Sequence, residues 1–330
     1  MSIEKDIQQK AEALGIDKCG IIRPEAMLGY EERLWERIRK IPRGESYYAN
    51  FTRFADIKRI YPWARSIVVV VLNYGHYRIP ESAQGRYGKS YLTDSRFNPD
   101  SPERKKIFAL EKYLHELGIR TETSEHPGLT AMRWAARQAG LGIIRRNNFF
   151  YTQKGSWSRV TAWITDKEME LKGDHSLPEC PAGCDRCIAA CPTKSLSSPY
   201  TMNMGTCVSR LTASNDPPSG DCEINRQLGG WIYGCDVCQD VCPMNRGKWT
   251  DDDDFPGLME LGESLAPEKI LAMDYEKIAR KLMPKFFYID KEHLWKWKLN
   301  AINAILNDSA NIHKERISAM LTDEYERGET

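Results

Sequence analysis

The chain has 330 residues, and its 47 Lys and Arg against 46 Asp and Glu give a formal net charge of +1. This length allows two or three domains, and the balanced charge gives no bulk electrostatic argument for nucleic-acid binding. The longest purely apolar run, Ile67–Leu72, is far shorter than the roughly 20 residues that span a bilayer, and the N-terminus lacks an apolar signal core. We therefore expect a cytoplasmic protein with reduced thiols.

Four elements are predicted in the first third of the chain. Apolar residues recur with helical period over residues 3–14, and Gly15 ends this helix. Residues 18–22 are predicted to form a strand, and the β-branched run 67–72 predicts a strand that is buried on both faces. Residues 102–117 carry an apolar stripe that predicts a second amphipathic helix.

A third helix and two more strands follow. Residues 119–123 and 160–165 are predicted strands, and residues 129–139 are a predicted helix that Gly140-Leu-Gly142 closes. Helices that alternate with apolar strands predict an α/β (α+β) layer domain over residues 1–172.

The rest of the chain is predicted to form two further regions. Residues 173–247 hold most of the cysteines and much Gly and Pro, so metal rather than a large apolar core should organise this part as a ferredoxin-like module. Residues 248–330 predict a short helical region. Its expected buried face consists of Leu294, Trp297, Leu299, Ile302 and Ile305.

Eight of the ten cysteines form a doubled metal-binding pattern. The first run is Cys180-PAG-Cys184-DR-Cys187-IAA-Cys191-Pro192, and the second is Cys235-DV-Cys238-QDV-Cys242-Pro243 with Cys207 upstream. Thiolates are soft ligands, and groups of four select zinc or iron–sulfur clusters. Zinc sites usually draw on separated CxxC pairs, so the tight CxxCxxxCP grouping favours two 4Fe-4S clusters.

In two-cluster ferredoxins, the fourth cysteine of each run binds the other cluster. This rule assigns Cys180, Cys184, Cys187 and Cys242 to cluster one, and Cys207, Cys235, Cys238 and Cys191 to cluster two. Cys222 is a rival to Cys207, but its polar surroundings, rich in Pro and Gly, are typical of an exposed loop. Cys19 lies on a predicted apolar strand, where a buried, inert thiol is expected.

Several segments together carry a family resemblance. They are Ala139-Gly-Leu-Gly142 with Asn147, Gly155-Ser-Trp157 leading to Ile164-Thr-Asp166, Cys191-Pro-Thr193, Cys207-Val-Ser209, and Gly229-Gly-Trp-Ile-Tyr-Gly-Cys-Asp-Val-Cys-Gln-Asp-Val-Cys-Pro243. On these residues the chain resembles the epoxyqueuosine reductase family. These are cobalamin-dependent iron–sulfur enzymes of tRNA queuosine synthesis that are related to reductive dehalogenases.

The resemblance implies a fold and a cofactor. The N-terminal domain would be of the cobalamin-processing and reductive-dehalogenase type and would hold base-off cobalamin, with electrons passing through the two clusters to cobalt and then to substrate. The implied cobalamin-binding residues are Gly140, Leu141, Gly142, Ile143, Arg146, Asn147, Ser156 and Trp157. Arg145 and Arg146 replace the family's usual Gly-Lys, and two such arginines are suited to an anion, to the amide-bearing rim of cobalamin, or to an exposed surface.

The proton donor departs from the family pattern. The stretch in which the family places an aspartate reads Ser124-Glu-His-Pro-Gly128, so Glu125 and His126 are the candidate acids. The alternative is that both residues cap the following helix. Tyr91 is a third catalytic candidate, because related dehalogenases use a tyrosine, and its alternative role is packing at a sheet edge.

The expected partners are an external low-potential electron donor, such as a ferredoxin or flavodoxin-like protein, and a substrate. The near-zero net charge and the short C-terminal region argue against tRNA, which proteins bind mainly through phosphate contacts, and leave a small molecule as the other substrate class. The sequence thus predicts a divergent cobalamin-dependent reductase. A reductive dehalogenase-like enzyme and a corrinoid or ferredoxin-type electron carrier are the alternatives.

Overall fold

The computed structural model describes residues 2–96, 98–123, 131–174, 176–217 and 222–307. The chain forms two compact units, and each is built from three separate segments. The first unit comprises residues 1–78, 95–204 and 237–256, and the second comprises residues 79–94, 205–236 and 257–330. No helix within the described ranges is long and apolar enough to cross a membrane.

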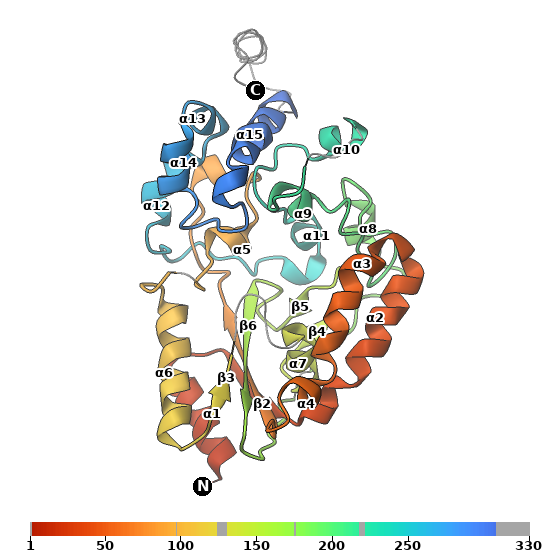
Figure 1. The fold of residues 1–330 in the computed structure, drawn as a ribbon, viewed down its shortest axis with the longest axis vertical. Helices are drawn as coiled ribbons and strands as arrows, with labels where there is room; N and C mark the ends of the chain where they lie inside the picture. The colour runs from red at the N-terminus through yellow and green to blue at the C-terminus, as the bar shows by residue number, and fades with distance from the viewer. Residues whose placement is uncertain (1, 97, 124–130, 175, 218–221, 308–330) are drawn as a thin grey trace. The chain divides into compact units, whose positions relative to one another are not determined.

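The first unit contains a four-stranded sheet in the order β1-β2-β6-β3 (Figure 1). Its strands are β1 Lys18–Ile22, β2 Ser66–Asn73, β6 Ser158–Thr165 and β3 Thr121–Glu122, and all neighbours are antiparallel. Lys18 pairs with Val71, and Ile67 pairs with Ile164. The predicted strands at 18–22, 67–72 and 160–165 are confirmed, whereas the strand predicted at 119–123 is shorter.

The central strand β2 is buried on both faces because its alternate residues enter two different cores. Val69 and Val71 pack with α7 (Met132–Gln138) on one face. Val68 and Val70 pack with α1 (Ile3–Ala13) and α6 (Pro102–Glu116) on the other. Figure 1 shows α1 and α6 beside the sheet, on the side opposite α7. The layered α/β architecture is confirmed, and so are the helices predicted at 3–14 and 102–117.

The remaining helices of the first unit are short, apart from α2. They are η1 Pro24–Met27, α2 Gly29–Lys40, η2 Pro42–Gly44, α3 Glu45–Tyr48, η3 Ala49–Phe54, α4 Ile57–Ile60, α8 Arg186–Ala189, α11 Val237–Asp240 and η5 Pro243–Asn245. The region that carries the cysteines therefore has little regular structure, as its composition predicts.

Cys19 on β1 is the buried thiol that the sequence predicts. Its residue is 8% exposed and packs in the core with α1 and α6. Burial, with a smaller contribution from Glu12, raises the pKa of the Cys19 thiol to about 12. A thiol with this pKa stays protonated and unreactive at neutral pH.

The second unit is helical around an aromatic core. Its helices are η4 Glu81–Ala83, α5 Lys89–Leu92, α9 Val208–Thr212, α10 Cys222–Gln227, α12 Leu258–Leu261, η6 Gly262–Leu265, α13 Pro267–Leu271, α14 Tyr275–Lys281, η7 Lys291–His293 and α15 Trp295–Asn307. Tyr233 stacks on Trp297 with ring centres 5.2 Å apart and planes at 11°, and Phe286 packs against both rings. The prediction of three domains at 1–172, 173–247 and 248–330 stays a prediction.

The predicted buried face of the last helix is wrong in part. Leu299 and Ile302 on α15 are only partly buried, whereas the polar residues Lys296 and Asn300 are buried. The Asn300 side chain donates to the carbonyls of Thr212 at 2.9 Å and Ile232 at 2.8 Å. A buried polar side chain that satisfies backbone carbonyls can replace an apolar one, and no apolar periodicity reveals it.

Candidate iron–sulfur site

A short hairpin forms the centre of the candidate site in the first unit. Strand β4 (Ile143–Ile144) pairs with β5 (Phe150–Tyr151), and the backbone N–H of Arg145 donates to the carbonyl of Phe149 at 3.0 Å. Asn148 lies at the turn with φ of 66°. Asparagine tolerates this left-handed conformation better than most residues.

The glycines before the hairpin allow close backbone contacts. Gly140 has φ of +70°, and a Cβ added to it would lie 2.1 Å from the carbonyl oxygen of Gly173. A Cβ on Gly142 would lie 2.2 Å from the carbonyl oxygen of Tyr151. Leu141 and Ile143 are each 3% exposed. This motif therefore packs against the chain's own backbone and core, which positions the hairpin.

Four consecutive hairpin residues hold four different parts of the chain. Arg145 donates to the carbonyl of Pro178 at 2.8 Å, and Arg146 donates to the carbonyl of Cys184. Asn147 donates to the carbonyl of Cys238 at 2.9 Å, and Asn148 donates to the carbonyl of Thr201 at 3.0 Å. The hairpin thus fixes the loops that carry the cysteines of both predicted clusters.

Ser156 and Trp157 also contact other residues of the first unit. The Ser156 hydroxyl donates to Gln239 at 2.8 Å and accepts from the Asn245 amide at 2.8 Å. Trp157 is 2% exposed and packs edge to face with Trp249. Gln239 and Asn245 flank Cys242, so Ser156 holds the loop of this cysteine.

The thiols predicted for cluster one are near enough to influence the charge of Cys187. Burial raises the pKa of Cys187 to about 11, and the nearby thiol groups of Cys242, Cys180 and Cys184 raise it further through charge repulsion. Like charges that repel one another in the apoprotein are stabilised by a bound cationic iron centre. The chemistry of this donor set therefore fits an iron–sulfur cluster.

Two ligands predicted for cluster two also lie in the first unit. Cys191 and Cys238 pack in one apolar cluster with Cys187 and Leu196. Cys207 and Cys235 belong to the second unit. The complete ligand set of cluster two stays a prediction.

Two buried polar atoms near the cysteines are consistent with bound iron–sulfur clusters. Arg145 Nε and Thr193 Oγ1 are buried and have no hydrogen-bond partner among the described residues. Arg145 Nη1 lies 3.8 Å from Cys180 Sγ, and Thr193 follows Cys191 by two residues. Donors in these places suit the sulfur atoms of bound clusters.

No three His, Cys, Asp or Glu side chains in the described part of the chain converge closely enough to hold a single metal ion. A 4Fe-4S cluster does not require such convergence, because each thiolate binds a different iron atom at a separate corner.

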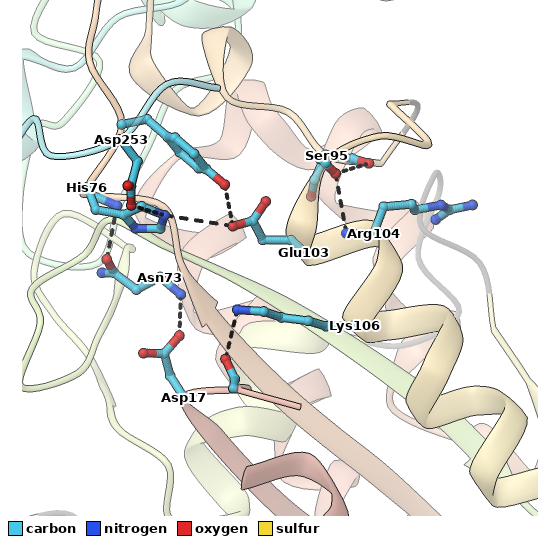
Figure 2. Close-up of polar contacts among 12 residues, drawn as sticks. Asp17, Asn73, His76, Ser95, Glu103, Arg104, Lys106 and Asp253 are labelled. Atoms are coloured by element: carbon cyan, nitrogen blue, oxygen red, sulfur yellow. Dashed lines mark hydrogen bonds and ion pairs between the residues drawn. The ribbon is translucent and has the colours of Figure 1, made fainter. Parts of the chain in front are cut away.

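A polar network that includes His76, Glu103 and Asp253 lies just after strand β2 and is not predicted from the sequence (Figure 2). Glu103 is 5% exposed and accepts from the Tyr77 hydroxyl at 2.7 Å. His76 Nε2 lies 3.9 Å from carboxylate oxygens of both Glu103 and Asp253. No local sequence pattern predicts this network. Glu103 has the position of an ordinary acidic residue in the first turn of a helix, and Asp253 belongs to an acidic run that is typical of a solvated loop.

Residues 180–245 match the family model of the 4Fe-4S double cluster binding domain. An epoxyqueuosine reductase of Atelocyanobacterium thalassa is 30% identical over 275 residues, which cover 79% of this chain and 87% of that protein. One of Gloeobacter violaceus is 31% identical over 76% of this chain and 80% of that protein. The chain belongs to the epoxyqueuosine reductase family.

A solved epoxyqueuosine reductase, crystallised with an epoxyqueuosine-modified tRNA stem loop, has the same fold. It is 25% identical, with a TM-score of 0.73 over 92% of this chain and 81% of that one. The predicted family and fold class are confirmed, and the double-cluster domain confirms iron–sulfur clusters over structural zinc. The tRNA bound to this relative stands in tension with the expectation, drawn from net charge, that tRNA is not a partner.

Of the three predicted catalytic residues in this epoxyqueuosine reductase family member, the structure describes Tyr91. Glu125 and His126 lie outside the described residues. Tyr91 lies in the second unit, where its hydroxyl is 3.0 Å from the Ser209 hydroxyl and its ring packs edge to face on Tyr233. Ser209 and Tyr233 are each two residues from a predicted cluster cysteine, Cys207 and Cys235.

Proposed function

We propose that this protein is a cobalamin-dependent iron–sulfur reductase that removes the epoxide oxygen of epoxyqueuosine in tRNA. The observation that carries the proposal is that residues 180–245, which include Cys180, Cys184, Cys187 and Cys242, match the double-cluster domain in a chain of this family. The relative solved with a modified tRNA stem loop supports tRNA as the substrate.

The residues of the chain supply a route and a scaffold for electrons. Cysteine thiolates hold the two clusters, which carry one electron each, and an external low-potential protein such as a ferredoxin or flavodoxin would reduce them. Cobalamin, when bound, supplies a cobalt centre that accepts these electrons and reduces the substrate. Removing an epoxide oxygen as water consumes two electrons and two protons and leaves a carbon–carbon double bond.

The chain must also deliver protons to the departing oxygen. We assign this role to Glu125 or His126, with Tyr91 as the third candidate, because general acids of these types work near neutral pH. Alanine at position 125 or 126 should reduce turnover by about 100-fold or more if that residue is the donor. Full turnover in both variants would exclude the pair.

The residues implied for cobalamin by the resemblance also make contacts within the protein. The side chains of Leu141 and Ile143 are buried in the first unit, and the polar groups of Arg146, Asn147 and Ser156 bond to the cluster-bearing loops. We propose that they serve cobalamin indirectly, by fixing the clusters. Any direct contact from Gly140 to Ile143 would then use backbone groups.

The proposal is tested with protein purified anaerobically in the presence of cobalamin. We expect about eight irons and one corrinoid per chain. With a chemical reductant, the loaded protein should convert an epoxyqueuosine-containing stem loop to a product lighter by one oxygen, seen by mass spectrometry. An unmodified stem loop is the matched control. Iron without corrinoid would favour an electron carrier, and a loaded protein that leaves epoxyqueuosine intact would refute the assigned substrate.

A further inference from the structure

A buried arginine lies against the first cysteine of cluster one. Arg145 is 2% exposed, and its Nη1 lies 3.8 Å from Cys180 Sγ. Its Nη2 donates to the carbonyl of Pro178, and its guanidinium carbon lies 5.1 Å from the centre of the Tyr151 ring. A buried guanidinium is stabilised by negative charge nearby, and the Cys180 sulfur would supply such charge as a thiolate ligand of the cluster.

Tyr151 provides a second donor, near Cys242, which is the last of the four predicted ligands of cluster one in chain order. This residue is 1% exposed, and burial, followed by the influence of the neighbouring Cys242 thiol, raises the pKa of its phenol. The Asn147 amide donates to the same hydroxyl oxygen at 2.9 Å. Because the amide occupies an acceptor position of the phenol, the phenol proton remains available for the Cys242 sulfur.

Donors to cluster sulfur affect the two redox states differently. One-electron reduction adds a negative charge to a cluster and makes its thiolate sulfurs better acceptors. A hydrogen bond or a positive charge at these sulfurs therefore stabilises the reduced state more than the oxidised state. Burial strengthens the effect, because a dry site screens charge poorly.

We propose that Arg145 and Tyr151 set the reduction potential of cluster one, raising it by donating to Cys180 and Cys242. The proposal rests on the cluster assignment above and not on the identity of the substrate. Neither residue binds iron or moves a proton. Their role is to favour the state in which this cluster holds one electron.

The test is an anaerobic redox titration of the cluster-loaded protein, followed by visible absorption and electron paramagnetic resonance. The variants are Tyr151→Phe, which removes only the hydroxyl, and Arg145→Gln, which removes the charge. At a fixed potential, each should lower the ratio of reduced to oxidised cluster one about tenfold, which is about 59 mV for one electron. Cluster two should keep its potential, and Arg145→Lys should recover part of the shift.

Two matched controls separate this role from a general loss of structure. Tyr77→Phe removes a buried phenol hydroxyl that bonds Glu103, and Arg120→Gln removes an arginine charge that packs on Trp63. Both should keep the wild-type potential. Wild-type potentials in Tyr151→Phe and Arg145→Gln, with full iron content, would overturn the proposal. If Arg145→Gln fails to load iron, the reduction potential of cluster one in Tyr151→Phe decides whether the proposal holds.

The outcome is independent of the proposed substrate. Shifted potentials in a protein that does not act on epoxyqueuosine would uphold the inference and refute the proposed function. Unchanged potentials in a protein that reduces epoxyqueuosine would do the opposite.

Discussion

Asn147 Nδ2 lies 2.9 Å from the backbone carbonyl oxygen of Cys238 and 2.9 Å from the hydroxyl of Tyr151. One amide therefore links strand β5 of the hairpin to the loop of the second cysteine run. The residue is 2% exposed, so water cannot replace the bonds if the amide is lost.

Replacing Asn147 should release the second cysteine run from the hairpin. We expect Asn147→Ala to lower the free energy of unfolding by about 1–3 kcal/mol and to reduce iron retention, because two buried polar groups lose their donor. Denaturant unfolding and iron analysis measure both effects. Asn50→Ala is the control, since the exposed Asn50 side chain donates to the nearby carbonyl of Ser46, and its removal should change the free energy of unfolding by less than about 0.5 kcal/mol. Equal effects in the two variants would contradict the assigned role.

Gly140 and Gly118 form a natural pair for testing close backbone approach. Both have φ near +70°, but only Gly140 has a neighbour within 4 Å of an added Cβ. Gly118→Ala should cost about 1–2 kcal/mol of unfolding free energy, which is the strain of the left-handed conformation alone. Gly140→Ala should cost at least about 2 kcal/mol more, because Gly173 must move. Calorimetric or denaturant unfolding measures the free energy of unfolding of the two variants. Similar losses of stability would show that the backbone at Gly173 can move at little energetic cost.

Cys207 and Cys222 compete for the fourth position of cluster two. If Cys207 is the ligand, Cys207→Ala should lower the iron content from about eight to about four per chain, whereas Cys222→Ala should keep about eight. Iron and sulfide analysis after anaerobic purification measures the content. The reverse pattern would assign the cluster to Cys222.

Cys19 predicts a dependence of stability on alkaline pH. Burial raises its folded pKa from 9.0 to about 12, so the folded state holds the thiol proton more tightly than the unfolded state. The resulting stability is fully present below the unfolded pKa and is lost as pH rises toward the folded pKa. Between about pH 9 and pH 10.5 the contribution should fall by about 2 kcal/mol.

The measurement is the difference in unfolding free energy between the native protein and Cys19→Ala over this pH range. The native protein should lose more stability than the variant, because only the native protein must keep this thiol protonated. Tyrosines common to both proteins cancel in the difference. Parallel pH profiles would show that Cys19 is not the group responsible.

Local sequence patterns are enough to predict the main strands and helices of the first unit and the type of metal site. The apolar run of β2, the stripe of α6 and the cysteine spacing are local patterns, and each depends only on residues close together in the chain. Alternation in a strand or a short CxxC spacing directly reflects backbone geometry, so these features were predicted without knowledge of the tertiary fold.

The contacts of the hairpin residues depend on the tertiary fold. Arg146, implied as a cobalamin residue, bonds to Cys184, and Arg145 lies against Cys180. On α15, Lys296 and Asn300 are buried, whereas the apolar pattern predicts burial of Leu299 and Ile302. The reason is the same in each case. A polar side chain takes its role from a hydrogen-bond partner far away in the sequence, and only folding brings the two together.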